Sequence, residues 1–126
     1  MFNLRGTPHL ACATAMLSAG ALSMPAQADA AYLYWTSFGV RSGSITTCLT
    51  FADSVMRQQS FTSIRRLPIE VSGSLGGMYA AITCIASPSR ATAVVMVVGD
   101  DGTAVVRTRD SLRDQIANMV CFDSPC

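Results

Sequence analysis

The sequence predicts a single α+β domain in which an antiparallel meander sheet carries two helices on one face, in the order β-α-β-β-β-α. Two segments with helical periodicity enclose three segments of alternating or β-branched apolar residues. Short turns join these three segments, as in an antiparallel meander. Four cysteines follow residue 28, and they predict a domain stabilised by disulfides.

The N-terminal half of the predicted domain is one strand followed by one helix. Residues 32–40 are rich in aromatic and apolar side chains and end at a turn, so they form the first predicted strand. The turn at 41–44 contains serines suited to helix capping. An amphipathic helix is predicted from there to about Gln59. Its apolar face consists of Ile45, Cys48, Leu49, Ala52, Val55 and Met56.

Three strands follow this helix. Residues 64–71 alternate between apolar and polar side chains and predict one half-exposed strand, in which Pro68 indicates an edge or a bulge. A flexible turn is predicted at 72–77, and a second alternating strand at 78–84. The β-branched run at 93–98 predicts a central strand.

The last predicted element is a helix from about Thr103 to Val120. Its apolar stripe consists of Val105, Leu112, Ile116 and Met119. Arginine and aspartate residues lie largely outside the stripe and predict a solvated face. We interpret the preceding residues 100–102, Asp-Asp-Gly, as a turn in which an aspartate caps the helix. The alternatives are a calcium loop, which would need the EF-hand spacing that is missing here, and an anion site at the start of the helix.

Residues 1–28 predict a cleavable signal peptide. The mostly small and apolar stretch from Leu10 to Leu22 is followed by Pro25 and by the small-x-small pattern Ala-Gln-Ala that ends at Ala28. Cleavage after Ala28 leaves residues 29–126 as one small domain. An uncleaved membrane anchor is the alternative, but the apolar stretch is short for a bilayer span. We therefore expect an exported protein, with the periplasm favoured and the extracellular space as the alternative.

The cysteine set predicts disulfides in an oxidising compartment. Of the three possible pairings we favour Cys48–Cys84 with Cys121–Cys126, because the second pair is local and the first would tie a helix to a strand. A zinc site or a thioredoxin-like redox site would need a C-x-x-C motif or histidine partners, and residues 29–126 contain neither.

Composition limits the chemistry further. Half of the 126 residues are apolar and 13% are charged, which excludes a disordered chain. Residues 29–126 hold eight arginines, eight acidic residues and no lysine or histidine, so nothing indicates nucleic-acid binding. Without histidine, neither a Ser-His-Asp nor a Cys-His site can form, and Glu70 is the only glutamate. We expect a protein that is not an enzyme and that holds no cofactor or metal.

The candidate interaction surface consists of Tyr32, Tyr34, Trp35, Arg65 and Arg66. Exposed Tyr and Trp side chains are frequent hot spots of interfaces, and the arginine pair could contact an acidic partner. In alternating geometry, Trp35 lies on the face of its strand opposite to the two tyrosines. The alternative interpretation is core packing for the aromatic residues and a solvated, aggregation-resistant strand edge for the arginines.

These observations predict a small exported, non-catalytic interaction or binding module with an unidentified protein partner. Inhibitors, immunity proteins and envelope accessory proteins share this size, export and disulfide content. The alternative is a periplasmic small-molecule-binding domain with a pocket between the helices and the sheet. The specific partner and the oligomeric state stay open at this level.

Overall fold

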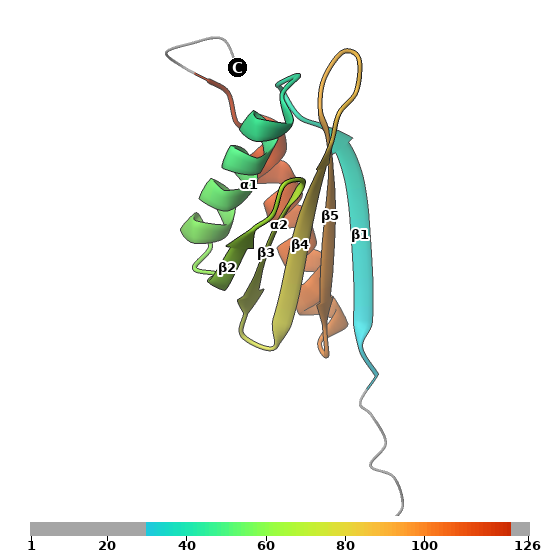
Figure 1. The fold of residues 1–126 in the computed structure, drawn as a ribbon. Coiled ribbons are helices and arrows are strands. Elements are labelled where there is room, and N and C mark those ends of the chain that lie inside the picture. Colours follow the sequence, from blue (N-terminus) through green and yellow to red (C-terminus); the bar gives the residue numbers. More distant parts are fainter. Residues whose placement is uncertain (1–29, 122–126) are drawn as a thin grey trace, which may run out of the picture.

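The computed structural model describes residues 30–121, which form a five-stranded sheet and two helices (Figure 1). The elements in chain order are β1 Tyr32–Gly39, α1 Ile45–Gln58, β2 Thr62–Arg66, β3 Glu70–Leu75, β4 Met78–Ile85, β5 Thr92–Gly99 and α2 Gly102–Asn118. The strand order across the sheet is β1-β5-β4-β3-β2, and all neighbouring strands are antiparallel. The predicted α+β class, the antiparallel meander and the two helices are confirmed.

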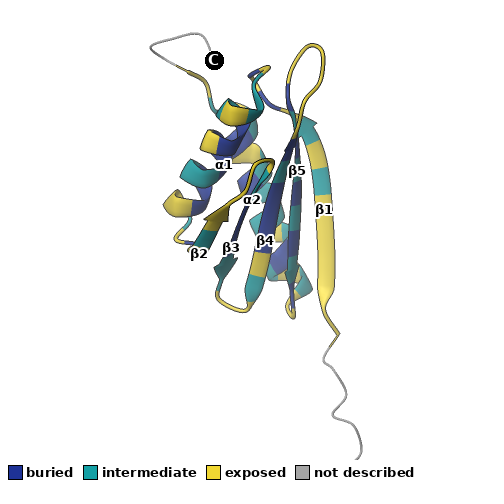
Figure 2. Cartoon of the chain, in the orientation of Figure 1, coloured by how far each residue is buried: buried dark blue, intermediate teal, exposed yellow. Residues whose placement is uncertain are grey.

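Both helices pack on the same face of the sheet. Helix α1 covers β2, β3 and β4, helix α2 covers β1 and β5, and the two helices touch each other. The core between the layers is fully buried (Figure 2) and is formed by small and β-branched side chains of the central strands against larger side chains of the helices. Its members include Ala80, Ile82, Val95, Val97, Val55, Met56, Leu112 and Ile116.

Both helices begin at the capping residues that the sequence indicates. The Ser44 hydroxyl accepts a hydrogen bond from the Thr47 N–H at 3.3 Å. The Asp101 carboxylate accepts hydrogen bonds from the N–H groups of Thr103 and Ala104 at 2.9 and 3.1 Å. These side chains satisfy amides of the first turn, which have no partner within the helix. The interpretation of residues 100–102 as a capped turn is therefore confirmed.

The sheet contains one strand more than the sequence predicts. The single strand expected at 64–71 is two strands, β2 and β3, because the chain reverses around Pro68, where the Leu67 N–H donates to the Glu70 carbonyl at 2.7 Å. Proline has no N–H for a strand ladder, so a turn accommodates it better than a strand interior. The prediction of a flexible turn at 72–77 is also wrong. Most of that segment belongs to β3, and only Gly76 and Gly77 form the turn.

The predicted disulfide between the helix and a strand is confirmed. Cys48 of α1 and Cys84 of β4 are bonded, with their Cα atoms 6.1 Å apart, and both are buried in the core. Cys121 is also disulfide-bonded. Its predicted partner Cys126 and the predicted signal peptide at 1–28 lie outside the described residues.

Gly99, at the end of β5, allows α2 to approach the sheet closely. A Cβ atom at this position would lie 2.8 Å from Cγ of Met78 and 3.0 Å from Cγ2 of Val105. Such distances are below van der Waals contact, so a larger residue would force the helix or the Met78 side chain to move.

Neither helix of the described segment is long and apolar enough to cross a membrane.

Candidate functional site

In the part of the chain that the structure describes, one face of the sheet carries no helix, and we call it the open face. Residues that pair across antiparallel strands point to the same side of a sheet, so the strand register assigns its members. They are Leu33, Trp35 and Ser37 of β1, Val94, Met96 and Val98 of β5, Tyr79, Ala81 and Thr83 of β4, Glu70, Ser72 and Ser74 of β3, and Thr62 and Arg65 of β2.

The half of the open face next to β1 is apolar. Trp35 is 63% exposed, Leu33 60% and Tyr79 47%. The register places Leu33, Val98 and Tyr79 in one row across three strands, and Trp35 next to Met96 in the adjoining row. Neighbouring strands lie about 4.8 Å apart, so these side chains adjoin one another. We call these five residues the apolar patch.

The other half of the open face is polar. Ser72 and Ser74 of β3 follow the apolar residues, and the Thr83 hydroxyl lies 3.5 Å from a carboxylate oxygen of Glu70. Arg65 ends the row that begins with Trp35, four strand spacings or about 19 Å away. The open face therefore changes from apolar at the β1 edge to polar and charged at the β2 edge.

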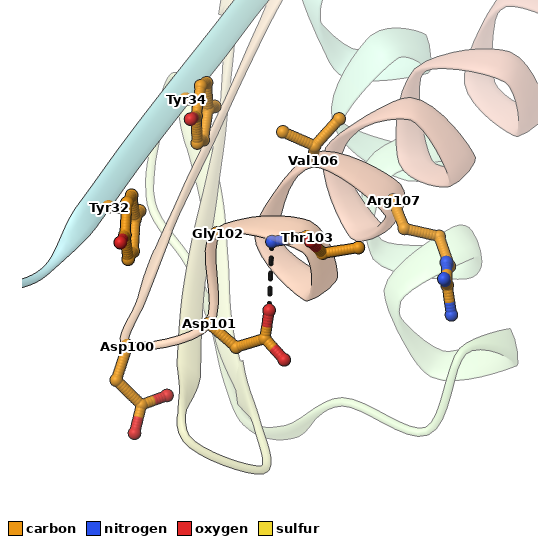
Figure 3. Close-up of a pocket in the computed structure, with 8 residues that line it drawn as sticks. All are labelled: Tyr32, Tyr34, Asp100, Asp101, Gly102, Thr103, Val106 and Arg107. Carbon is orange, nitrogen blue, oxygen red and sulfur yellow. Dashed lines mark hydrogen bonds between the residues drawn. The ribbon is translucent and has the colours of Figure 1, made fainter.

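Tyr32 and Tyr34 lie on the opposite face of β1, beside α2. They line a surface groove of about 840 Å³ (Figure 3), together with Asp100, Asp101, Gly102, Thr103, Val106 and Arg107. The Arg109 guanidinium lies over the Tyr34 ring, with its central carbon 5.9 Å from the ring centroid. The groove combines two phenolic rings with acidic groups and one arginine. The first-turn amides of α2 are already occupied by Asp101, so they do not offer an anion site.

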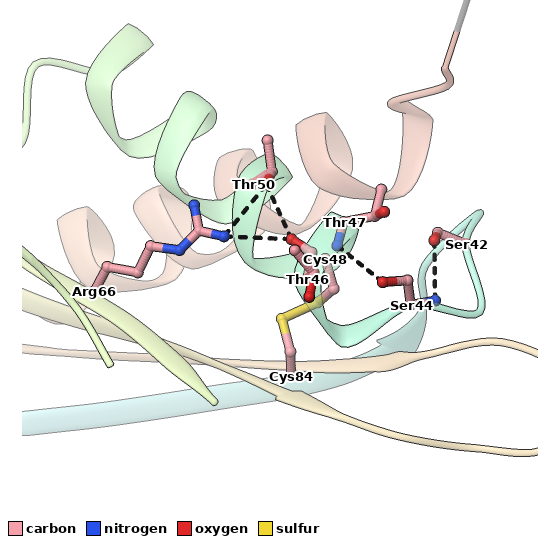
Figure 4. Close-up of a disulfide and its surroundings, with 8 residues drawn as sticks. All are labelled: Ser42, Ser44, Thr46, Thr47, Cys48, Thr50, Arg66 and Cys84. Carbon is pink, nitrogen blue, oxygen red and sulfur yellow. Dashed lines mark hydrogen bonds between the residues drawn. A yellow bond between two sulfur atoms is a disulfide. The ribbon is translucent and has the colours of Figure 1, made fainter. Parts of the chain in front are cut away.

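Arg66 also lies on the helix side, as Figure 4 shows beside the disulfide. Its Nη2 atom is 3.4 Å from the Thr46 carbonyl oxygen and 3.4 Å from the Thr50 hydroxyl of α1. The five predicted interaction residues are thus divided between two faces. Trp35 and Arg65 share the open face but stand at opposite edges of it. Tyr32, Tyr34 and Arg66 lie on the side of the helices.

One ion pair on helix α1 joins two residues of the same helix. The Arg57 guanidinium donates to the Asp53 carboxylate at 2.8 Å one turn away, and this hydrogen bond lowers the pKa of Asp53. The pair is on the surface, as expected of an i,i+4 contact that supports a helix. Within residues 30–121, no group of three or more histidine, cysteine or acidic side chains could hold a metal ion.

Sequence reasoning missed Leu33, Tyr79, Met96 and Val98 as members of an exposed patch. The signal was present in the run from Ala93 to Val98, which is apolar at every position and therefore places apolar side chains on both faces of β5. A strand of this kind is normally covered on both sides. In this structure the helices cover one side only.

The sequence matches no known protein-family model and no curated protein.

Proposed function

We propose that this protein is a small exported interaction module that binds a partner protein through the apolar patch of its open face. One observation carries the proposal: large apolar side chains, Trp35 foremost, lie contiguous and exposed on a sheet face that neither described helix covers. Antiparallel sheets with one solvated face usually place polar residues on it. Contiguous exposed apolar surface is typical of sites that another molecule covers.

The composition of the patch favours a protein as its partner. Trp and Tyr are the residues most enriched among interface hot spots, because each buries a large, rigid area while keeping a polar atom for hydrogen bonding. Trp35 and Tyr79 supply two such anchors, and the partly exposed Ser74 of β3, which pairs with Tyr79, supplies a polar group at the rim. An interface with an apolar centre and a polar rim is the usual anatomy of protein recognition. The expected partner surface is accordingly apolar at its centre.

Export is supported by the signal-peptide pattern together with the disulfide. Disulfides between buried cysteines persist in oxidising compartments such as the periplasm or the extracellular space, and Cys48–Cys84 is of this kind. Intact-mass measurement of the protein from its natural host tests this part. The expected chain begins at Asp29 and is lighter by about four hydrogens, for two disulfides. Retained residues 1–28 or four alkylatable thiols would contradict it.

Adjacent residues of β1 provide a matched test of the binding surface. Trp35 lies on the open face and Tyr34 on the groove side. Proteins that co-purify with a C-terminally tagged chain are identified, and the stoichiometric one is then purified for titration with the variants. We expect Trp35→Ser and Tyr79→Ser to weaken binding at least tenfold and Tyr34→Ser to leave it unchanged. Binding that survives both open-face substitutions would refute the proposal.

The groove beside α2 supports a second candidate function, the binding of a small molecule. Its volume of about 840 Å³ falls in the range of ligand sites, and its lining includes phenolic, carboxylate and guanidinium groups. A thermal-shift screen of small polar metabolites tests it, since a bound ligand raises the Tm. A hit that Tyr34→Ser abolishes and Trp35→Ser retains would favour this function. Hits that are equally affected by both substitutions would exclude the groove.

A further inference from the structure

The two edges of the sheet differ in their capacity to pair with another strand. At one edge, β2 has five residues, two of them arginines, and its register with β3 shifts between Thr62 and Arg65. Short length, charge and a bulge are the features by which proteins protect sheet edges from pairing. At the other edge, β1 runs for eight residues without a charge, a proline or a shift in register. Of the two sheet edges formed by residues 30–121, the β1 edge is the one suited to the addition of a strand.

The hydrogen bonds at the end of β1 show which of its backbone groups face outward. The Val40 N–H donates to the Ala91 carbonyl at 2.8 Å. Hydrogen-bonded pairs alternate along an antiparallel ladder, so the even-numbered residues of β1 bond to β5. The N–H and C=O groups of Leu33, Trp35 and Ser37 then point away from the sheet. In the described part of the chain β1 pairs with β5 alone, and Figure 1 shows it as the outermost strand.

We propose that β1 pairs antiparallel with β1 of a second copy of this chain, which joins the two sheets into one continuous sheet. In the most central register, Trp35 lies opposite Trp35 of the second copy, and Leu33 lies opposite Ser37. The outward groups of these three residues then exchange about six hydrogen bonds across the seam. The pairing uses the backbone of β1 and does not depend on the partner protein proposed above.

Three features favour a second copy as the occupant of this edge. The strand is uncharged, so two copies meet without like-charge repulsion. A two-fold axis makes the same edge complementary to itself, and the protected β2 edges stop the assembly at a dimer instead of a fibre. The apolar patch adjoins β1, so dimerisation places the two patches next to each other and partly buries Trp35 and Leu33 at the seam.

Ser37→Pro is the sharpest test, because it removes an outward N–H and leaves the N–H groups that bond to β5. Sedimentation equilibrium of the oxidised, exported protein measures the mass over a dilution series. The fluorescence of Trp35, the only tryptophan of the chain, reports on the seam itself. We expect the wild type and the control Ser37→Ala to be dimers whose emission shifts to longer wavelength as they dissociate. Ser37→Pro is expected to raise the dissociation constant at least tenfold, with an unchanged circular-dichroism spectrum.

If Ser37→Pro does not fold, Trp35→Lys replaces it, with Trp35→Phe as its control. The lysine places two like charges opposite each other across the two-fold axis, so the lysine variant is expected to be a monomer and the phenylalanine variant a dimer. A wild type that is monomeric throughout the dilution series, or a dimer that withstands the disruptive variant, overturns the inference. Tyr79→Ser separates the two proposals, since it should weaken partner binding at least tenfold and retain the dimer. A monomer that still binds its partner refutes only the dimer, and a dimer that captures no partner refutes only the proposed function.

Discussion

Removal of the Cys48–Cys84 disulfide is expected to lower the free energy of unfolding by about 4 kcal/mol. The bridge joins residues 36 positions apart. In the chain-entropy treatment, closing a loop of this length restricts the unfolded chain enough to stabilise the folded state by about 4 kcal/mol at 25 °C. Total stability of a single domain is roughly 5–15 kcal/mol, so the loss is a large fraction of it. For a domain of this size it corresponds to a fall in Tm of about 16–32 °C.

The perturbation has to preserve the packing around the bridge, because both cysteines are buried in the core. The double variant Cys48→Ala/Cys84→Ala keeps the site apolar and leaves no free thiol. The single variant Cys48→Ser leaves the Cys84 thiol unpaired and buries a hydroxyl, and it should also lose a few kcal/mol.

Urea unfolding followed by far-UV circular dichroism measures the effect under oxidising conditions. The wild type in the presence of a reductant is the matched control, and it should unfold at least as readily as the double variant. The same reductant added to the double variant isolates the contribution of the bridge at Cys121. A double variant within about 1 kcal/mol of the oxidised wild type would refute the reasoning, because a tether across a loop of this length should restrict the unfolded chain far more.

Three further predictions test the packing, the capping and the surface charge. Gly99→Ala should lower the free energy of unfolding, measured with urea, by about 1–3 kcal/mol, because its Cβ would overlap the side chains beneath α2. The control Gly43→Ala should leave the free energy of unfolding almost unchanged, because no atom lies within 4 Å of the new Cβ. Asp101→Ala should lower the free energy of unfolding by about 1 kcal/mol, because it removes the N-cap of α2. Urea unfolding measures this too, and an unchanged urea midpoint would contradict the capping role. The hydrogen bond from Arg57 lowers the pKa of Asp53 in the folded state. The ionised Asp53 carboxylate therefore stabilises the fold fully at pH values above its ordinary pKa of 3.8, and this contribution is lost as the pH falls through the lowered pKa. The stability difference between wild type and Asp53→Asn should therefore shrink as the pH is lowered through this range, and a difference that is independent of pH would disprove the assignment.

The helices were accessible to sequence reasoning because their signals are local. The periodicity that predicts a helix from Ile45 to about Gln59 is matched by α1, which ends at Gln58. Helix α2 likewise matches the predicted second helix, and Asp101 caps it as predicted. The pairing of Cys48 with Cys84 was favoured among three possibilities, because Cys121 and Cys126 are close in the sequence and the other pair ties a helix to a strand.

The hairpin of β2 and β3 was not accessible in this way. The alternation of apolar and polar residues continues through Leu67, Pro68 and Ile69, so a period of two does not mark the turn between them. Leu67 and Ile69 are exposed although their spacing resembles that of a buried strand face. The turn position is decided by the pairing of β3 with its neighbours on both sides, which is a non-local property.

The sequence by itself determined that Trp35 and Tyr34 lie on opposite sides of β1, because side chains alternate along any strand. It could not determine which side the helices cover, since the apolar run of β5 suits either one. Only the tertiary structure decided this, by placing α1 and α2 on the side of Tyr34 and leaving Trp35 on the open face. It also placed Arg65 on that face, through the register shift that Ser63 introduces into β2 with its φ of 52°. The physical reason is that a local pattern fixes relative orientation within a strand, whereas the choice of the covered face depends on the packing of the whole domain.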